Sequence, residues 1–159
     1  MWRIVFLLAL AAALPAAEKY TGPRPPKPDL IYIVHASNLV PTEQAEATEG
    51  KKKDDTIYTV SGAESPAKTP VAEPIFILES KSLSPERVQL YRMEVKNGQR
   101  EIVFPPPGKR RKDAPRPMHL SLRRLGDGLY RIEANEFLPN GEYALSPEGS
   151  NTVFCFQVY

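Results

Sequence analysis

Short apolar runs separated by turn-forming residues are the dominant pattern of this chain. Residues 30–35 (LIYIVH) are apolar on both faces, which predicts a strand in the interior of a sheet. Residues 55–61 (DTIYTVS) and 74–78 (PIFIL) predict two more strands, and the charged residues 50–55 (GKKKDD) predict a turn between the first strand and these two. Residues 43–49 suit either about two turns of helix or an edge strand, and the pattern leaves both open.

A tight hairpin is predicted at Asn97-Gly98, because both residue types accept the positive φ of a type I′ turn. A two-residue loop there sets three pairs opposite each other: Lys96–Gln99, Met93–Ile102 and Tyr91–Phe104. The two apolar pairs share one face, which supports this register. The other face then places Glu94 opposite Glu101, an arrangement that requires a solvated face.

A second hairpin is predicted around Gly126-Asp127-Gly128. A three-residue loop pairs Leu122 with Ile132 and Leu120 with Ala134, and so builds an apolar face, whereas a two-residue loop would pair Arg123 with Ile132. We therefore expect the three-residue loop. The opposite face then carries polar residues: His119, Ser121, Arg123, Arg131, Glu133 and Asn135.

The C-terminal region predicts two strands joined to the rest by a tight corner. Pro139, followed by Asn140-Gly141, favours a turn, and Tyr143 is placed to donate a hydrogen bond back across it. In the last strand (TVFCFQVY, 152–159), the apolar residues predicted to be buried are Phe154, Phe156 and Val158.

Prolines, 17 in 159 residues, separate these short strands and disfavour long helices. Short strands at spacings near ten residues predict a single antiparallel Greek-key, immunoglobulin-like β-sandwich. The Leu138-Pro139-x-Gly141-x-Tyr143 corner with the last strand resembles the last two strands of fibronectin-type and other immunoglobulin-like domains. The region 30–159 also resembles a group of uncharacterised secreted bacterial proteins that end in a GEYAL…FCF pattern. That resemblance implies a fold class and a compartment, and no functional residue.

An export signal is predicted before this domain. Met1-Trp2-Arg3 supplies one positive charge, residues 4–14 form an unbroken apolar run, and small residues lead into Glu18-Lys19. The run is shorter than the roughly 20 residues that a membrane-spanning helix needs. Cleavage after Ala16 or Ala17 is expected, with Ala13 as a further alternative. The predicted organisation is a signal peptide over 1–17, a proline-rich extended lead over 18–28 and a β-sandwich over 29–159.

Charge and cysteine content indicate in which cellular compartment the protein is expected. Loss of residues 1–17 removes one arginine and no acid, so the remaining domain is close to neutral, which disfavours a general polyanion binder. The single cysteine, Cys155, allows no internal disulfide and is expected to be buried, and no Asn-x-Ser/Thr sequon occurs. We expect a secreted or periplasmic protein of the bacterial envelope, without a transmembrane span.

No catalytic constellation is predicted. His35 and His119 lie in separate strands without metal-ligand spacing, so one packed and one solvent-facing histidine are expected. Neither a Gly-x-Ser-x-Gly elbow nor a glycine-rich phosphate loop occurs. We therefore expect no catalytic residue, no cofactor and no metal, and the protein is not expected to be an enzyme.

Basic residues are the only candidates for a contact site. Lys109, Arg110, Arg111 and Lys112 lie in a proline-flanked loop, where they are expected either to contact an anionic partner or to be simply solvated. No aromatic residue interleaves with them, so nucleic acid is an unfavoured partner. Arg123 opposite Arg131 requires neutralisation, either by Glu133 or by an anion or acidic partner.

The sequence favours an exported protein that acts by binding or assembly, with an envelope protein or an acidic cell-surface polymer as the expected partner. Two alternatives remain open. One is a hydrolase accessory or a cryptic metal enzyme that uses His35 or His119. The other is a subunit of a surface assembly that pairs through an exposed edge strand.

Overall fold

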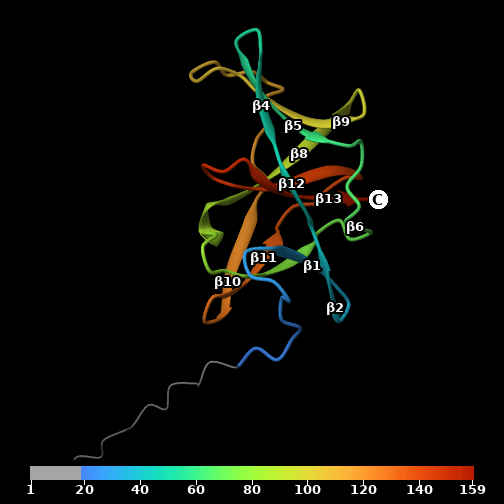
Figure 1. Cartoon of the computed structure of the whole chain (residues 1–159), viewed down its shortest axis with the longest axis vertical. Helices are drawn as coiled ribbons and strands as arrows, with labels where there is room; N and C mark the ends of the chain where they lie inside the picture. The colour runs from blue at the N-terminus through green and yellow to red at the C-terminus, as the bar shows by residue number, and fades with distance from the viewer. Residues whose placement is uncertain (1–18) are drawn as a thin grey trace, which may run out of the picture.

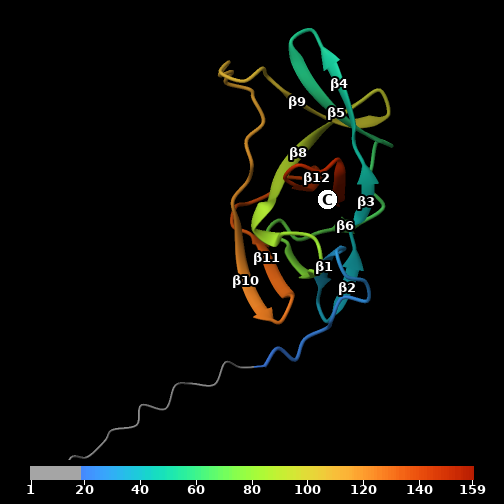
Figure 2. The same ribbon diagram turned by 60° about the vertical axis from the view of Figure 1, so that its left-hand side comes forward.

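The computed structural model describes residues 19–159, so the predicted signal peptide lies outside the described residues. The described chain is all-β, with thirteen strands, one 3-10 helix (η1, Pro85–Arg87) and two sheets (Figures 1 and 2). The predicted all-β class is therefore confirmed. The two sheets are antiparallel apart from one short parallel pair, and one sheet curls into a half-barrel.

The first sheet has five strands in the order β10-β11-β7-β1-β2. Their bounds are β1 Ile31–His35, β2 Asn38–Pro41, β7 Ile75–Glu79, β10 Leu120–Gly126 and β11 Leu129–Ala134. β1 lies between β2 and β7, and Ile31, Tyr32 and Ile33 are buried on both faces, as the continuous apolar run predicts.

The second sheet follows the order β3-β13-β12-β8-β9-β5-β4. Its strands are β3 Glu43–Glu46, β4 Thr48–Lys52, β5 Asp55–Ser61, β8 Val88–Lys96, β9 Gln99–Phe104, β12 Gly141–Pro147 and β13 Thr152–Val158, and the short β6 Lys68–Thr69 pairs with β13 in parallel. Only Ala47 separates β3 from β4, yet these strands lie at the two ends of the path. The sheet must therefore curl back toward its own beginning.

Residues 43–49 form extended strands and no helix. The edge-strand alternative is confirmed, because β3 and β4 each lie at an end of the sheet. The charged turn predicted over 50–55 is shorter than expected. It consists of Lys53-Asp54, because Gly50, Lys51 and Lys52 already pair with β5, up to the pair Lys52–Asp55.

The larger apolar core lies between the five-stranded sheet and one face of β8, β12 and β13. Phe156 on β13 packs against Phe76 on β7, with ring centroids 5.1 Å apart, and stacks on Tyr143 at 5.6 Å. Phe154, Phe156 and Val158 are all buried, as predicted. Val153 and Cys155 are buried on the other face of the same strand, so β13 separates two cores.

The Asn97-Gly98 hairpin has the predicted turn and register. Asn97 and Gly98 have φ angles of 50° and 74°, and Lys96 pairs with Gln99. The ladder ends at the pair Glu94–Glu101, so the predicted pairs Met93–Ile102 and Tyr91–Phe104 do not form. The two glutamates are neutralised locally, because the Lys96 ammonium lies 2.9 Å from Glu94 and 3.1 Å from Glu101.

The second hairpin has the predicted pairs Leu120–Ala134 and Leu122–Ile132, but the predicted three-residue loop is wrong. Gly126 pairs with Leu129, so the turn has two residues, and a β-bulge between Arg124 and Gly126 restores the register. A bulge adds one residue to one strand and so shifts the alternation in the same way as a longer loop. The apolar face also reaches less far than expected, since Leu122 is exposed.

The predicted tyrosine corner is present: the hydroxyl of the fully buried Tyr143 donates a 2.5 Å hydrogen bond to the Pro139 carbonyl. Replacement of Tyr143 by phenylalanine removes this donor and leaves a partly buried carbonyl without its partner. We expect Tyr143→Phe to lower the free energy of unfolding by about 1–2 kcal/mol, measured by urea denaturation. Tyr20→Phe removes a comparable bond, 3.1 Å to the Pro23 carbonyl in the lead segment, and is the control. An equal loss of stability in both variants would contradict a special role for the corner.

Candidate functional site

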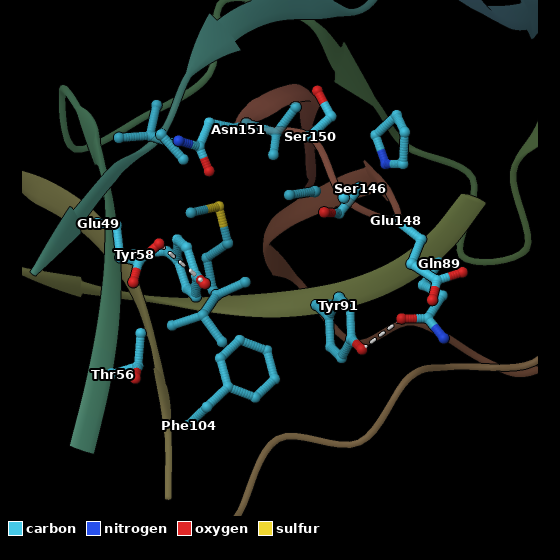
Figure 3. Close-up of a pocket in the computed structure, with 18 of the residues that line it drawn as sticks. Glu49, Thr56, Tyr58, Gln89, Tyr91, Phe104, Ser146, Glu148, Ser150 and Asn151 are labelled. Atoms are coloured by element: carbon cyan, nitrogen blue, oxygen red, sulfur yellow. Dashed lines mark hydrogen bonds between the residues drawn. The ribbon is translucent and has the colours of Figure 1, made fainter. Parts of the chain in front are cut away.

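The half-barrel contains a cavity of about 610 Å³ that opens at one end (Figure 3). It lies between β4, β5 and β9 on one side and β8, β12 and β13 on the other. The ladder between β8 and β9 stops at Glu94–Glu101, after which β9 continues beside β5 and β8 continues beside β12. The cavity forms because these two halves of the curled sheet diverge.

Small side chains at inward positions add to this space. Ala47 follows β3 directly, and Ala144 and Ser146 are inward residues of β12; all three line the cavity. Larger side chains at such positions would fill the interior of a narrow curled sheet. The cavity volume is within the range typical of small-molecule sites.

The deep surface of the cavity is apolar and its wall is aromatic. Met93, Ile102, Val60 and Val153 form the buried floor, and three aromatic residues, Tyr58, Tyr91 and Phe104, line the wall. Phe104 meets both tyrosines edge to face, with ring centroids 5.9 Å from Tyr58 and 5.4 Å from Tyr91. These mutual contacts hold the aromatic wall in place without a ligand.

Polar groups surround the opening (Figure 3). The Tyr91 hydroxyl donates to the Gln89 amide oxygen at 2.7 Å, and the Tyr58 hydroxyl lies 3.4 Å from a Glu49 carboxylate oxygen. Burial raises the pKa of Tyr91, and burial together with the Glu49 charge raises the pKa of Tyr58. Both phenols therefore stay protonated near neutral pH. The other polar residues at the opening are Thr56, Ser146, Glu148, Ser150 and Asn151.

The opposite end of the half-barrel is closed by a buried charge cluster around Arg100, whose side chain is 0% exposed. Its Nη1 and Nη2 donate to the two oxygens of Glu43 at 2.6 and 2.9 Å, a bidentate pair. Nε and Nη2 also donate to the carbonyls of Gly62 at 2.9 Å and Ser61 at 2.7 Å. The guanidinium therefore links β9 to β3 and to the end of β5.

A second carboxylate, Glu142 on β12, lies 3.7 Å from Arg100 Nη1 and accepts the backbone N–H of Ser65 at 3.0 Å. Burial raises the pKa of Glu142, because Arg100 and Ser65 compensate its desolvation only in part. Burial also acts on Glu43, but the bonds from Arg100 outweigh it and lower its pKa. The nearby Cys155 is fully buried, and burial raises its pKa to about 12.

Sequence reasoning missed the Arg100 cluster, the aromatic wall as a site and the cavity. One signal was present: Arg100 shares the alternation of Ile102 and Phe104, so the predicted hairpin register already turned Arg100 toward the interior. The buried Cys155 was predicted correctly.

The four basic residues Lys109, Arg110, Arg111 and Lys112 are exposed in the loop between β9 and β10. Two of them contact acidic residues at the tip of the β4–β5 hairpin: Lys109 lies 3.6 Å from Asp54, and Arg111 lies 3.0 Å from Asp55. The loop leaves the half-barrel at the cavity opening, where Pro105 and Pro107 are lining residues.

Arg123 and Arg131 are directly opposite each other, as predicted. Arg131 forms an ion pair with Glu133, which is the internal neutralisation considered from the sequence. Both arginines lie on the first sheet, apart from Lys109–Lys112. The structure thus places the six predicted contact residues in two separate groups.

His35 and His119 are both exposed, so the expectation of one packed histidine is wrong. His35 ends β1, whereas His119 directly precedes β10, with β7 and β11 between these strands. Three strand spacings amount to about 14 Å, beyond the reach of a hydrogen bond or a shared metal ion. Within residues 19–159, no three His, Cys, Asp or Glu side chains group in a way that could hold a metal.

In the same described part of the chain, no helix has the length and apolar character needed to cross a membrane. No known protein family, curated protein or solved structure matches this chain.

Proposed function

We propose that this protein is an exported binding protein whose half-barrel cavity takes the apolar body of a small ligand. The observation that carries the proposal is the open cavity of about 610 Å³ with an apolar floor, an aromatic wall and a polar opening. An apolar surface with a few hydrogen-bonding groups at its edge is the usual chemistry of a ligand site. Met93, Ile102 and Val153 supply apolar contact, while Gln89 and Asn151 supply hydrogen bonds at the opening.

The protonation of the cysteine and of the two tyrosines near the cavity favours binding without catalysis. Cys155 is buried beneath the floor with a pKa of about 12, so it is a thiol and a poor nucleophile. The two tyrosines at the wall are neutral hydrogen-bonding groups. The proposal places this binding outside the cytoplasm, in the periplasm or the exterior, on the basis of the export signal in residues 1–17.

Assembly through an edge strand is less well supported than ligand binding. The free edges of the first sheet are β2, which ends at Pro41, and β10, which carries exposed Arg123 and Arg124 and a bulge. Proline, charge and bulges are the usual devices that oppose edge-to-edge pairing.

We also propose that the two-sheet fold is an immunoglobulin-like Greek-key β-sandwich. The support for it is the tyrosine corner, formed by Tyr143 and Pro139, which is a feature of such sandwiches. An experimental structure tests this fold: a strand order that matches known immunoglobulin-like domains would support the proposal, and a different order would contradict it.

The binding proposal is tested with N-phenyl-1-naphthylamine, an uncharged apolar dye that fluoresces when it leaves water. The chain from residue 18 onward is expected to bind the dye saturably. Ser146→Trp puts an indole into the cavity and is expected to weaken binding about tenfold or more, since it occupies the ligand's space. The matched control is Ser37→Trp in the exposed β1–β2 turn, which should leave binding unchanged. Absence of saturable binding, or equal binding by both tryptophan variants, would contradict the proposal.

A further inference from the structure

Two basic segments that are far apart in the sequence meet at the open end of the half-barrel. One is the tip of the β4–β5 hairpin, residues 51–55 (KKKDD), and the other is part of the β9–β10 loop, residues 109–113 (KRRKD). The ion pairs Lys109–Asp54 at 3.6 Å and Arg111–Asp55 at 3.0 Å hold the segments together. In Figure 1 the loop lies beside the hairpin at the top of the molecule. We call Lys51–Lys53 and Lys109–Lys112 together the cationic rim.

The cationic rim concentrates positive charge. The two segments contain seven Lys and Arg residues against three Asp residues, whereas the whole chain has a formal net charge of only +2. All seven cations are exposed. Within residues 19–159, only Lys109 and Arg111 of the rim form ion pairs. The other five rim cations have no acidic partner in this part of the chain.

The rim borders the cavity directly. The Lys51 ammonium donates a 2.6 Å hydrogen bond to the hydroxyl of Thr56, and Thr56 lines the opening. On the other segment, Pro105 and Pro107 line the opening just before the chain reaches Lys109. A ligand seated on the apolar floor would therefore present its outer end to these cations.

The two carboxylates at the opening do not cancel this charge. Glu148 is engaged by Arg87, whose Nε lies 3.0 Å from it, on the β12–β13 side of the opening. Glu49 faces the Tyr58 hydroxyl. Even with Glu49 counted, positive charge exceeds negative charge around the rim.

Resting on the proposed function, we infer that the ligand is an anionic amphiphile. Its hydrocarbon body packs on Met93, Ile102 and Val153, and its phosphate, sulfate or carboxylate group lies at the cationic rim. Hydrogen bonds between cations and an anionic group are stronger than neutral ones, and the apolar floor supplies the hydrophobic contribution. Because the rim is exposed, its contribution is screened by salt.

The inference is tested by displacement of N-phenyl-1-naphthylamine with two amphiphiles of the same chain length, dodecyl phosphate and dodecyltrimethylammonium, below their micelle concentrations. Dodecyl phosphate is expected to bind about tenfold more tightly at low salt, and its advantage should shrink in about 0.5 M NaCl. Inorganic phosphate alone is expected to leave the dye bound, because it has no apolar body.

Variants separate the rim from the cavity. Arg110→Glu with Lys112→Glu reverses two rim charges and is expected to weaken dodecyl phosphate about tenfold while leaving dye binding unchanged. The control is Lys81→Glu with Arg123→Glu, which changes the net charge by the same amount at exposed sites outside the cavity lining. It should change the affinity neither for dodecyl phosphate nor for the dye.

The outcomes distinguish the two proposals. If the dye binds but both amphiphiles displace it equally, the inference is overturned and the binding function stands. If no apolar probe binds, the binding function itself fails. Sedimentation with phosphatidylglycerol vesicles is the last arm: vesicle binding without displacement of the dye by dodecyl phosphate would mean that the rim contacts a membrane surface, and would also overturn the inference.

Discussion

Replacement of Arg100 by methionine is expected to lower the free energy of unfolding by about 3–5 kcal/mol, because it leaves buried carboxylates without their cation. Arg100 is 0% exposed, is paired with Glu43 through two bonds and lies 3.7 Å from Glu142. The Ser61 and Gly62 carbonyls would lose their donors at the same time. Urea denaturation, with the midpoint and slope compared between variants, measures the effect.

Three further variants make this prediction specific. Arg123→Met removes an exposed arginine on β10 and is expected to change stability by no more than about 0.5 kcal/mol. Arg100→Lys keeps the charge but loses the bidentate geometry, so an intermediate loss of stability is expected. This variant keeps the prediction testable if Arg100→Met does not fold. The triple variant Arg100→Met, Glu43→Leu, Glu142→Met should regain stability over Arg100→Met alone. A loss below about 1 kcal/mol in Arg100→Met would contradict a structural role for the cluster.

Phe156→Ala is the second large effect, with an expected loss of about 3–5 kcal/mol. Phe156 is fully buried, stacks on Tyr143 and meets Phe76 of the opposite sheet edge to face. Its removal would take away aromatic contacts from both sheets and leave a cavity that the rigid strands close only in part. The same denaturation experiment measures it, and Phe156→Leu should cost clearly less because most of the volume remains.

The chain offers a matched control at Phe137, whose side chain is 68% exposed. The same substitution there, Phe137→Ala, should change stability by no more than about 0.5 kcal/mol. Similar losses at both positions would mean that Phe156 does not join the two sheets as described.

Local patterns were sufficient for much of the strand arrangement. Asn97-Gly98 and the Tyr143 corner were predicted because their turn chemistry involves residues close in sequence. The pairs Leu120–Ala134 and Leu122–Ile132 were also predicted, since alternation strongly constrains register. The loop length was wrong because a two-residue turn with a bulge and a three-residue loop give the same pairing.

The site was largely beyond sequence reasoning. Glu43, Arg100 and Glu142 are separated by more than forty residues from one another, and they meet only because the sheet curls. The cavity depends on the divergence of β8 and β9 after Glu94–Glu101, which no local pattern indicates. Lys51–Lys53 and Lys109–Lys112 were visible as separate charge runs, but their meeting at the opening was not.

By itself the sequence determined the β class, the hairpin registers, the buried face of the last strand and the burial of Cys155, because turn preferences and alternation act over a few residues. It also carries the pattern from which export is predicted. The tertiary structure alone decided that the second sheet curls, that Arg100 closes one end of it and that a cavity with a cationic rim opens at the other. These features arise from packing between strands that are distant in the chain, and such contacts leave almost no local signal.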